Sequence, residues 1–136
     1  MPFTPPPTLM AVVMALMGAA HFINAPLFTS IMPDYLPHHL ALVYVSGLCE
    51  IFLAAMLLSQ RTRALAGWGL MALYVAVFPA NVHFALHPDL PLAGMPSWMP
   101  RPSPLLAWLR LPFQALFVYW AYAYTRTTRM ERALES

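Results

Sequence analysis

One carboxylate, Glu50, stands inside a long apolar segment, LVYVSGLCEIFLAAMLL, where few other side chains could do chemistry. In a helix that starts at His39 it would lie about 16 Å along the axis, far from either end. An ionisable group at such depth in a membrane is costly, so it suggests a function. The other polar side chains that fall within apolar segments are His21, Asn81, Arg110 and Gln114. We predict that these five residues form one ligand-binding site.

The residue types suggest a role for each member of this predicted site. Glu50 and His21 would hydrogen-bond to a polar head group, or exchange protons with it. Arg110 would balance the charge, while the amides of Asn81 and Gln114 would orient the bound molecule. If all helices turn these side chains inward, Glu50 should lie within ion-pair or one-water reach of Arg110 or His21.

A purely structural interpretation stays open. A buried Glu50–Arg110 pair, with both amides satisfying the remaining donors and acceptors, can simply hold helices in register. If Arg110 is the partner, Arg110→Ala should then destabilise the fold by roughly 3–5 kcal/mol. An interior histidine such as His21 is also often only a hydrogen-bonded core residue.

Other chemistries find less support. The ten Met and five His include the pairs His83/His87 and Met95/Met99, each four residues apart, and thioethers with imidazole suit Cu(I). Copper binding is thus a minor alternative, although no compact cluster is present and we predict no metal ligands. The lone Cys49 excludes an internal dithiol, and motifs for nucleotide binding, serine hydrolysis and zinc proteolysis are absent.

The elements that would position these residues are membrane helices. Of the 136 residues, 60% are hydrophobic and only 9% are charged, far fewer charges than soluble domains carry. Each of four apolar blocks has about the 20 residues that cross a bilayer. We predict a single domain over residues 1–136, an all-α integral membrane four-helix bundle with antiparallel up-down topology. The expected spans are residues 8–25, 39–58, 64–84 and 105–125, followed by a tail at 126–136.

Two prolines fall inside these spans. The last helix should begin near Pro104 with Ser103 as its cap and should bend at Pro112. Pro79 has no N–H to donate to the Val75 carbonyl, which the Asn81 side chain or a ligand would then serve.

Arginine placement predicts the orientation of the spans. Five arginines fall on one side, against Arg101 and Arg110 on the other; the five are Arg61, Arg63, Arg126, Arg129 and Arg132. The positive-inside rule puts both termini and the segment 59–63 in the cytoplasm of a cell with an inner membrane. The bilayer is therefore the expected partner, and these short clusters do not favour nucleic-acid binding.

The chain resembles the DoxX family of small four-helix membrane proteins. The stretches that carry the resemblance are GAAHFINAPLF, IMPDYLP, LVYVSGLCEIFLAAMLL, FPANVHFA and RLPFQALFVYWAY. Gly47 and Glu50 occupy its SGxxE segment. Because members are linked to membrane-associated redox, the resemblance implies a redox accessory protein with redox partners and a lipophilic ligand such as a quinone. It also implies an alternative, since remote relatives act as chaperones or cargo receptors.

Three functions therefore remain open at this point: a ligand-binding or redox accessory protein, a chaperone or assembly subunit, and an enzyme with Glu50 and His21 as acid and base. An open pocket of several hundred cubic ångströms at the polar residues would favour a ligand. A tightly packed interior with a completed Glu50–Arg110 pair would favour the assembly subunit.

Overall fold

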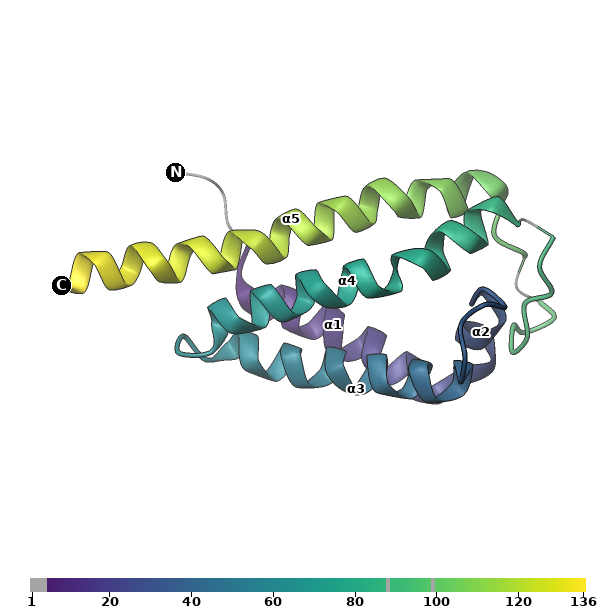
Figure 1. Ribbon diagram of the computed structural model, residues 1–136, viewed down its shortest axis with the longest axis horizontal. Helices are drawn as coiled ribbons and strands as arrows, with labels where there is room; N and C mark the ends of the chain where they lie inside the picture. Colours follow the sequence, from purple (N-terminus) through teal and green to yellow (C-terminus); the bar gives the residue numbers. More distant parts are fainter. Residues whose placement is uncertain (1–4, 88, 99) are drawn as a thin grey trace.

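The protein is all-helical, as its sequence predicts. The computed structural model describes residues 5–87, 89–98 and 100–136, without the side chains of 127–132, and this part of the chain contains no strand. Its helices are α1 (Pro7–Ile23), α2 (Ala25–Ser30), α3 (His39–Leu58), α4 (Arg63–Leu86) and α5 (Pro104–Glu135). The four long helices alternate in direction along the chain, and α2 lies at the same end as the α4–α5 connection (Figure 1).

The long helices associate as two pairs. α1 packs along α3, α4 packs along α5, and the α3–α4 contact joins the two pairs. Only residues 59–62 separate α3 from α4, so these two helices must run antiparallel. α5 extends beyond the ends of the other helices (Figure 1).

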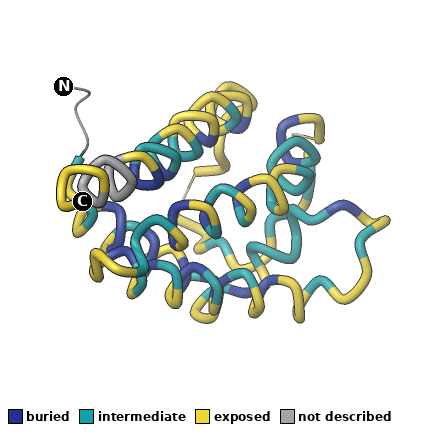
Figure 2. The backbone as a smooth tube through the Cα atoms, turned by 60° about the vertical axis from the view of Figure 1, so that its left-hand side comes forward, coloured by how far each residue is buried: buried dark blue, intermediate teal, exposed yellow. Residues whose placement is uncertain are grey.

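One core runs through all four long helices. Its most deeply buried members are Met10 of α1, Leu57 of α3, Ala66 and Leu70 of α4, and Ala121 and Tyr124 of α5. Exposed residues recur along every long helix beside this core (Figure 2). Each helix therefore buries one face and leaves an apolar face uncovered.

A smaller core closes the end of the molecule at which α2 lies. Phe84, Ala85 and Ala107 are buried there, and Ile31 from the end of α2 packs against them. The Asn24 side chain donates a hydrogen bond of 3.3 Å to the Gly94 carbonyl, which links the two long connections.

The helix bounds match two of the expected spans closely. α3 coincides with residues 39–58, and α4 extends the third span by one residue before and two after. Both are long and apolar enough to cross a membrane, whereas α1 is apolar but has only 17 residues. The first span was expected to reach residue 25, but α1 ends at Ile23. Pro26 has no N–H with which to continue the ladder of α1.

The last helix, α5, begins as predicted. The Ser103 hydroxyl accepts a hydrogen bond from the Leu106 N–H, and Pro104 occupies the first turn, where its missing N–H costs nothing. Pro79 and Pro112 both lie inside continuous helices. Unlike α3 and α4, α5 is not apolar enough over the described residues to qualify as a span, since Arg110, Pro112 and Gln114 interrupt it.

Candidate functional site

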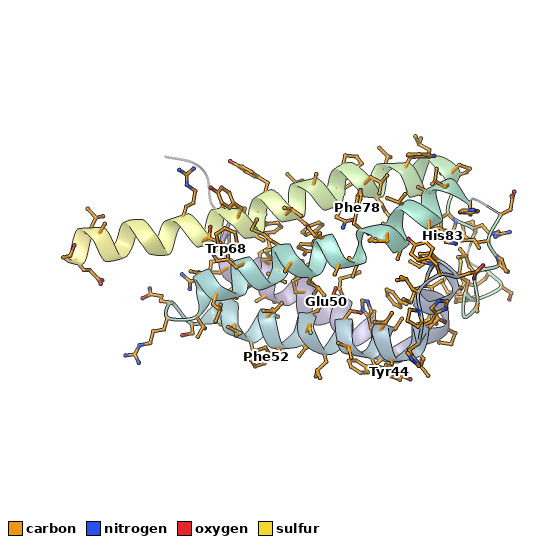
Figure 3. All side chains as sticks on the ribbon, in the orientation of Figure 1. Tyr44, Glu50, Phe52, Trp68, Phe78 and His83 are labelled. Atoms are coloured by element: carbon orange, nitrogen blue, oxygen red, sulfur yellow. The ribbon has the colours of Figure 1, made fainter. Side chains whose placement is uncertain are left out.

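Glu50 lies near the middle of α3 on the side that faces α4, whereas Tyr44 and Phe52 of the same helix point away (Figure 3). Its side chain is only 9% exposed. One carboxylate oxygen, Oε2, is fully buried and has no hydrogen-bond partner among the described residues. Because unpaired buried oxygens are rare in native proteins, this atom needs an explanation.

The atom nearest to this oxygen belongs to His21. Its Nδ1 lies 3.4 Å from Glu50 Oε2, within the expected ion-pair reach. The same Nδ1 lies only 2.7 Å from the Met17 carbonyl oxygen. A carbonyl oxygen can only accept, so the hydrogen bond to Met17 assigns the proton to Nδ1 and directs it away from Glu50. Charge-assisted hydrogen bonds are shorter, about 2.7–2.9 Å, so the His21–Glu50 contact is close but incomplete.

The His21 ring is held in place from two sides. Met17 accepts from Nδ1, and the Phe28 ring of α2 stacks on the imidazole with a centroid distance of 4.0 Å. These contacts leave Nε2 without a hydrogen-bond partner in the described part of the chain. A histidine fixed through one nitrogen presents the other as a defined acceptor.

Two glycines bring His21 to Glu50. A Cβ on Gly18 would lie 2.7 Å from the Gly47 carbonyl oxygen, and one on Gly47 would lie 2.7 Å from His21 Cβ. The backbones of α1 and α3 therefore touch directly at this level, as small residues allow between membrane helices.

The two amides form a separate polar group between α4 and α5. Asn81 Nδ2 donates a 2.6 Å hydrogen bond to Gln114 Oε1, and Gln114 Nε2 donates to the Tyr74 carbonyl oxygen. Asn81 thus bonds to Gln114, whereas we had expected its side chain or a ligand to serve the Val75 carbonyl left without the Pro79 donor. The prediction that all polar side chains gather around Glu50 is wrong, because Asn81 and Gln114 bond to each other and to the Tyr74 backbone within the α4–α5 pair.

Arg110 joins neither group. Its side chain is exposed, and its guanidinium carbon lies 5.5 Å from the Phe84 ring centroid. Among the described residues Glu50 forms no ion pair with an arginine, and its only ion-pair contact is with His21. The structural interpretation based on a Glu50–Arg110 pair is therefore wrong. The large loss of stability expected for Arg110→Ala depended on this pair, so we no longer expect it.

Tyr74 contacts both helix pairs and was not predicted as a site residue. Its hydroxyl donates to Met14 Sδ of α1 at 2.8 Å, and its carbonyl accepts from Gln114 of α5. The available signal was its position two helical turns before Asn81, on the same face. Phe28, which stacks on His21, gave no such signal, because it lies on a separate short helix.

A groove of about 310 Å³ opens between α4 and α5. Tyr74 and Gln114 contribute to its wall, and the other lining residues are apolar: Val75, Phe78, Leu111, Ala115 and Val118. Neither Glu50 nor His21 lines it. The void that we considered diagnostic of a ligand therefore borders the amide group and not Glu50.

The structure brings together one of the two residue pairs that suggested copper binding, His83 and His87. The rings of His83 and His87 lie 4.2 Å apart, and His87 Nδ1 donates to the His83 carbonyl oxygen at 2.9 Å. Met99 lies outside the described residues. Over the described residues no group of three or more His, Cys, Asp or Glu side chains is arranged to hold a metal ion.

Comparison with known proteins corrects the family. A model of a domain of unknown function, DUF8561, matches residues 10–125, which include all five predicted site residues. The chain belongs to this family. The resemblance to DoxX is therefore wrong. The segments that carried it are largely apolar, and apolar runs with small residues are common to unrelated membrane helices. Searches of curated proteins and of solved structures found no match.

Proposed function

We propose that this member of the DUF8561 family is a membrane-embedded antiparallel four-helix bundle that binds a lipid-soluble amphiphile. The polar head of the amphiphile would contact Glu50 and His21, and its apolar tail would lie in the groove between α4 and α5. The expected redox association and quinone rested on the DoxX resemblance, so neither is part of the proposal.

The uncovered apolar surface supports membrane insertion. In the most apolar stretches of α3 and α4, only 28% and 22% of the residues are buried. Large apolar side chains in these helices are more than half exposed, among them Leu48, Phe52 and Val75. Water-soluble monomers rarely expose so much continuous apolar surface, whereas lipid chains would cover it without cost.

The observation that carries the ligand proposal is the buried, unpartnered Glu50 Oε2. A carboxylate oxygen without a donor costs free energy, so it persists where a bound group completes its hydrogen bonding. An assembly subunit with no ligand has no use for this oxygen, and the structure lacks the Glu50–Arg110 pair that would favour such a subunit. Tyr74 supports a route from head to tail, because it lines the groove and its hydroxyl bonds to Met14 of α1, the helix that carries His21.

The first test is to identify what copurifies with the protein. Mass spectrometry of the protein purified in a mild detergent should find an amphiphile near one molecule per chain. Glu50→Gln removes the charge with little change in shape. We expect it to lower this occupancy by about tenfold or more, because it removes one hydrogen bond to a charged group. Glu135→Gln, the same change at an exposed position on α5, should leave the occupancy unaltered. Equal lipid content in all three proteins would contradict the proposal.

The second test concerns topology. We expect the segment 59–62 to face the cytoplasm and the loop around Ala93 to face outward. In a Cys49→Ala background, an impermeant maleimide applied to intact cells, made permeable in the outer membrane where one is present, should label Ala93→Cys. It should label Gln60→Cys only after lysis, since both positions are exposed but lie at opposite ends of the helices. External labelling of Gln60→Cys alone would show the opposite orientation. External labelling of both positions would contradict the prediction that they lie on opposite sides of the membrane.

A further inference from the structure

The chemistry of the Glu50–His21 site narrows the class of ligand, on the assumption that the proposed function is correct. We propose that the head group of the ligand is a protonated amine, and hence that the ligand is a long-chain primary or secondary ammonium. Two features of the site support this proposal. Glu50 Oε2 and His21 Nε2 have no hydrogen-bond partner among the described residues, and no arginine there pairs with Glu50.

The free atoms of the site are acceptors. Glu50 Oε2 lacks a donor, and His21 Nε2 carries the lone pair because the ring proton is on Nδ1, bonded to Met17. An N–H or O–H group of a ligand would complete either atom. A head group with carbonyl oxygens alone, such as an oxidised quinone, would offer no donor to the carboxylate.

An ionised Glu50 would also have no balancing charge in the described part of the chain. No arginine contacts it among the described residues, since Arg110 lies against Phe84 and Arg63 donates to the Leu57 carbonyl oxygen at the far end of α3. The side chain of His21 does not supply the missing donor, because its Nδ1 proton points at Met17. A buried carboxylate is stabilised when a cation pairs with it and hydrogen-bonds to it.

An ammonium is the head group that meets both requirements. It brings a positive charge to Glu50 and at least two N–H donors, one for Oε2 and one for His21 Nε2. An alcohol would bring one donor and no charge, and a fatty acid carboxylate would be repelled. Hydrogen bonds to an ionised partner are the stronger ones, so the site should rank these heads in the order ammonium, alcohol, carboxylate.

The test compares three probes with the same twelve-carbon chain: dodecylamine at neutral pH, dodecan-1-ol and dodecanoate. Their binding to the full-length protein in nonionic detergent is measured by native mass spectrometry. We expect the ammonium to bind about tenfold more tightly than the alcohol, in line with the added strength of a charge-assisted hydrogen bond. Glu135→Gln should keep this ranking. Glu50→Gln should reduce ammonium binding to the level of the alcohol, and Glu50→Asp, which retains the charge, should keep a preference for the ammonium.

The outcomes separate this inference from the function on which it rests. Glu50-dependent binding of alcohol and amine with equal affinity would overturn the ammonium but leave amphiphile binding standing. An ammonium preference that survives Glu50→Gln would also overturn it, because the head would then bind elsewhere. Failure of every probe to bind the wild-type protein would overturn both. If Glu50→Gln fails to fold, equal affinities of alcohol and amine for the wild-type protein would still overturn the ammonium.

Discussion

Gly18→Ala should lower the free energy of unfolding by about 2 kcal/mol, a typical cost of inserting a methyl group where packing leaves no room. The new Cβ would lie 2.7 Å from the Gly47 carbonyl oxygen and 3.2 Å from Glu50 Cβ. The first neighbour is backbone, so α1 and α3 must separate to admit the methyl group. This loss should exceed the gain of about 1 kcal/mol that alanine brings over glycine in a helix.

Gly69→Ala is the matched control for this prediction. Its Cβ would meet Leu53 Cδ2 at 2.6 Å, and the end of a leucine side chain can rotate away. We therefore expect a change near zero, with the helix propensity gain offsetting the repacking. Reversible unfolding in mixed detergent micelles, followed by circular dichroism, measures both variants. Equal stability of Gly18→Ala and Gly69→Ala would show that α1 and α3 do not approach as closely as described.

Gln114→Leu should lower the free energy of unfolding by about 2–3 kcal/mol, because it strands the Asn81 amide against apolar neighbours. Gln114 is buried, accepts from Asn81 and donates to the Tyr74 carbonyl oxygen. Leucine has a similar volume but offers neither group. The same unfolding measurement applies here.

Two companion variants test whether the pair acts as a unit. Asn81→Leu combined with Gln114→Leu removes both partners, so the double variant should recover much of the stability that the single change loses. Arg110→Ala serves as a comparison, since it removes only a contact with Phe84, which we expect to contribute no more than about 1 kcal/mol. Additive losses in the double variant would contradict the pairing. A larger loss for Arg110→Ala than for Gln114→Leu would restore Arg110 as a buried partner.

Much of the secondary structure follows from local signals. The largely apolar run that begins after His39 predicts α3 to the residue, and Ser103–Pro104 correctly predicts the start of α5. Capping side chains and proline restrict the backbone of their immediate neighbours, so their effects need no knowledge of the rest of the chain. The early end of α1 at Ile23 comes from a proline whose effect reaches back to the preceding turn. α5, in contrast, continues to Glu135, ten residues beyond the expected end of the span.

The composition of the polar site was also evident from sequence, but its arrangement was not. Glu50 and His21 do lie together, and Asn81 and Gln114 do bond to each other. Helical periodicity places each residue on a face of its own helix, yet it carries no information on which helix covers that face. For this reason the prediction of one cluster that included Arg110 was wrong, and Tyr74 and Phe28 were not predicted.

The sequence by itself therefore determined the all-α class, most bounds of the long helices and the polar residues that fall within apolar segments. Only the tertiary structure decided that these residues divide into two groups. The physical reason is close packing between segments distant in sequence. Gly18 and Gly47 let α1 and α3 touch, which brings His21 to Glu50, while α4 and α5 pack against each other and pair Asn81 with Gln114. Arg110 is left on the surface beside Phe84, and Glu50 keeps an oxygen that no described residue of the chain satisfies.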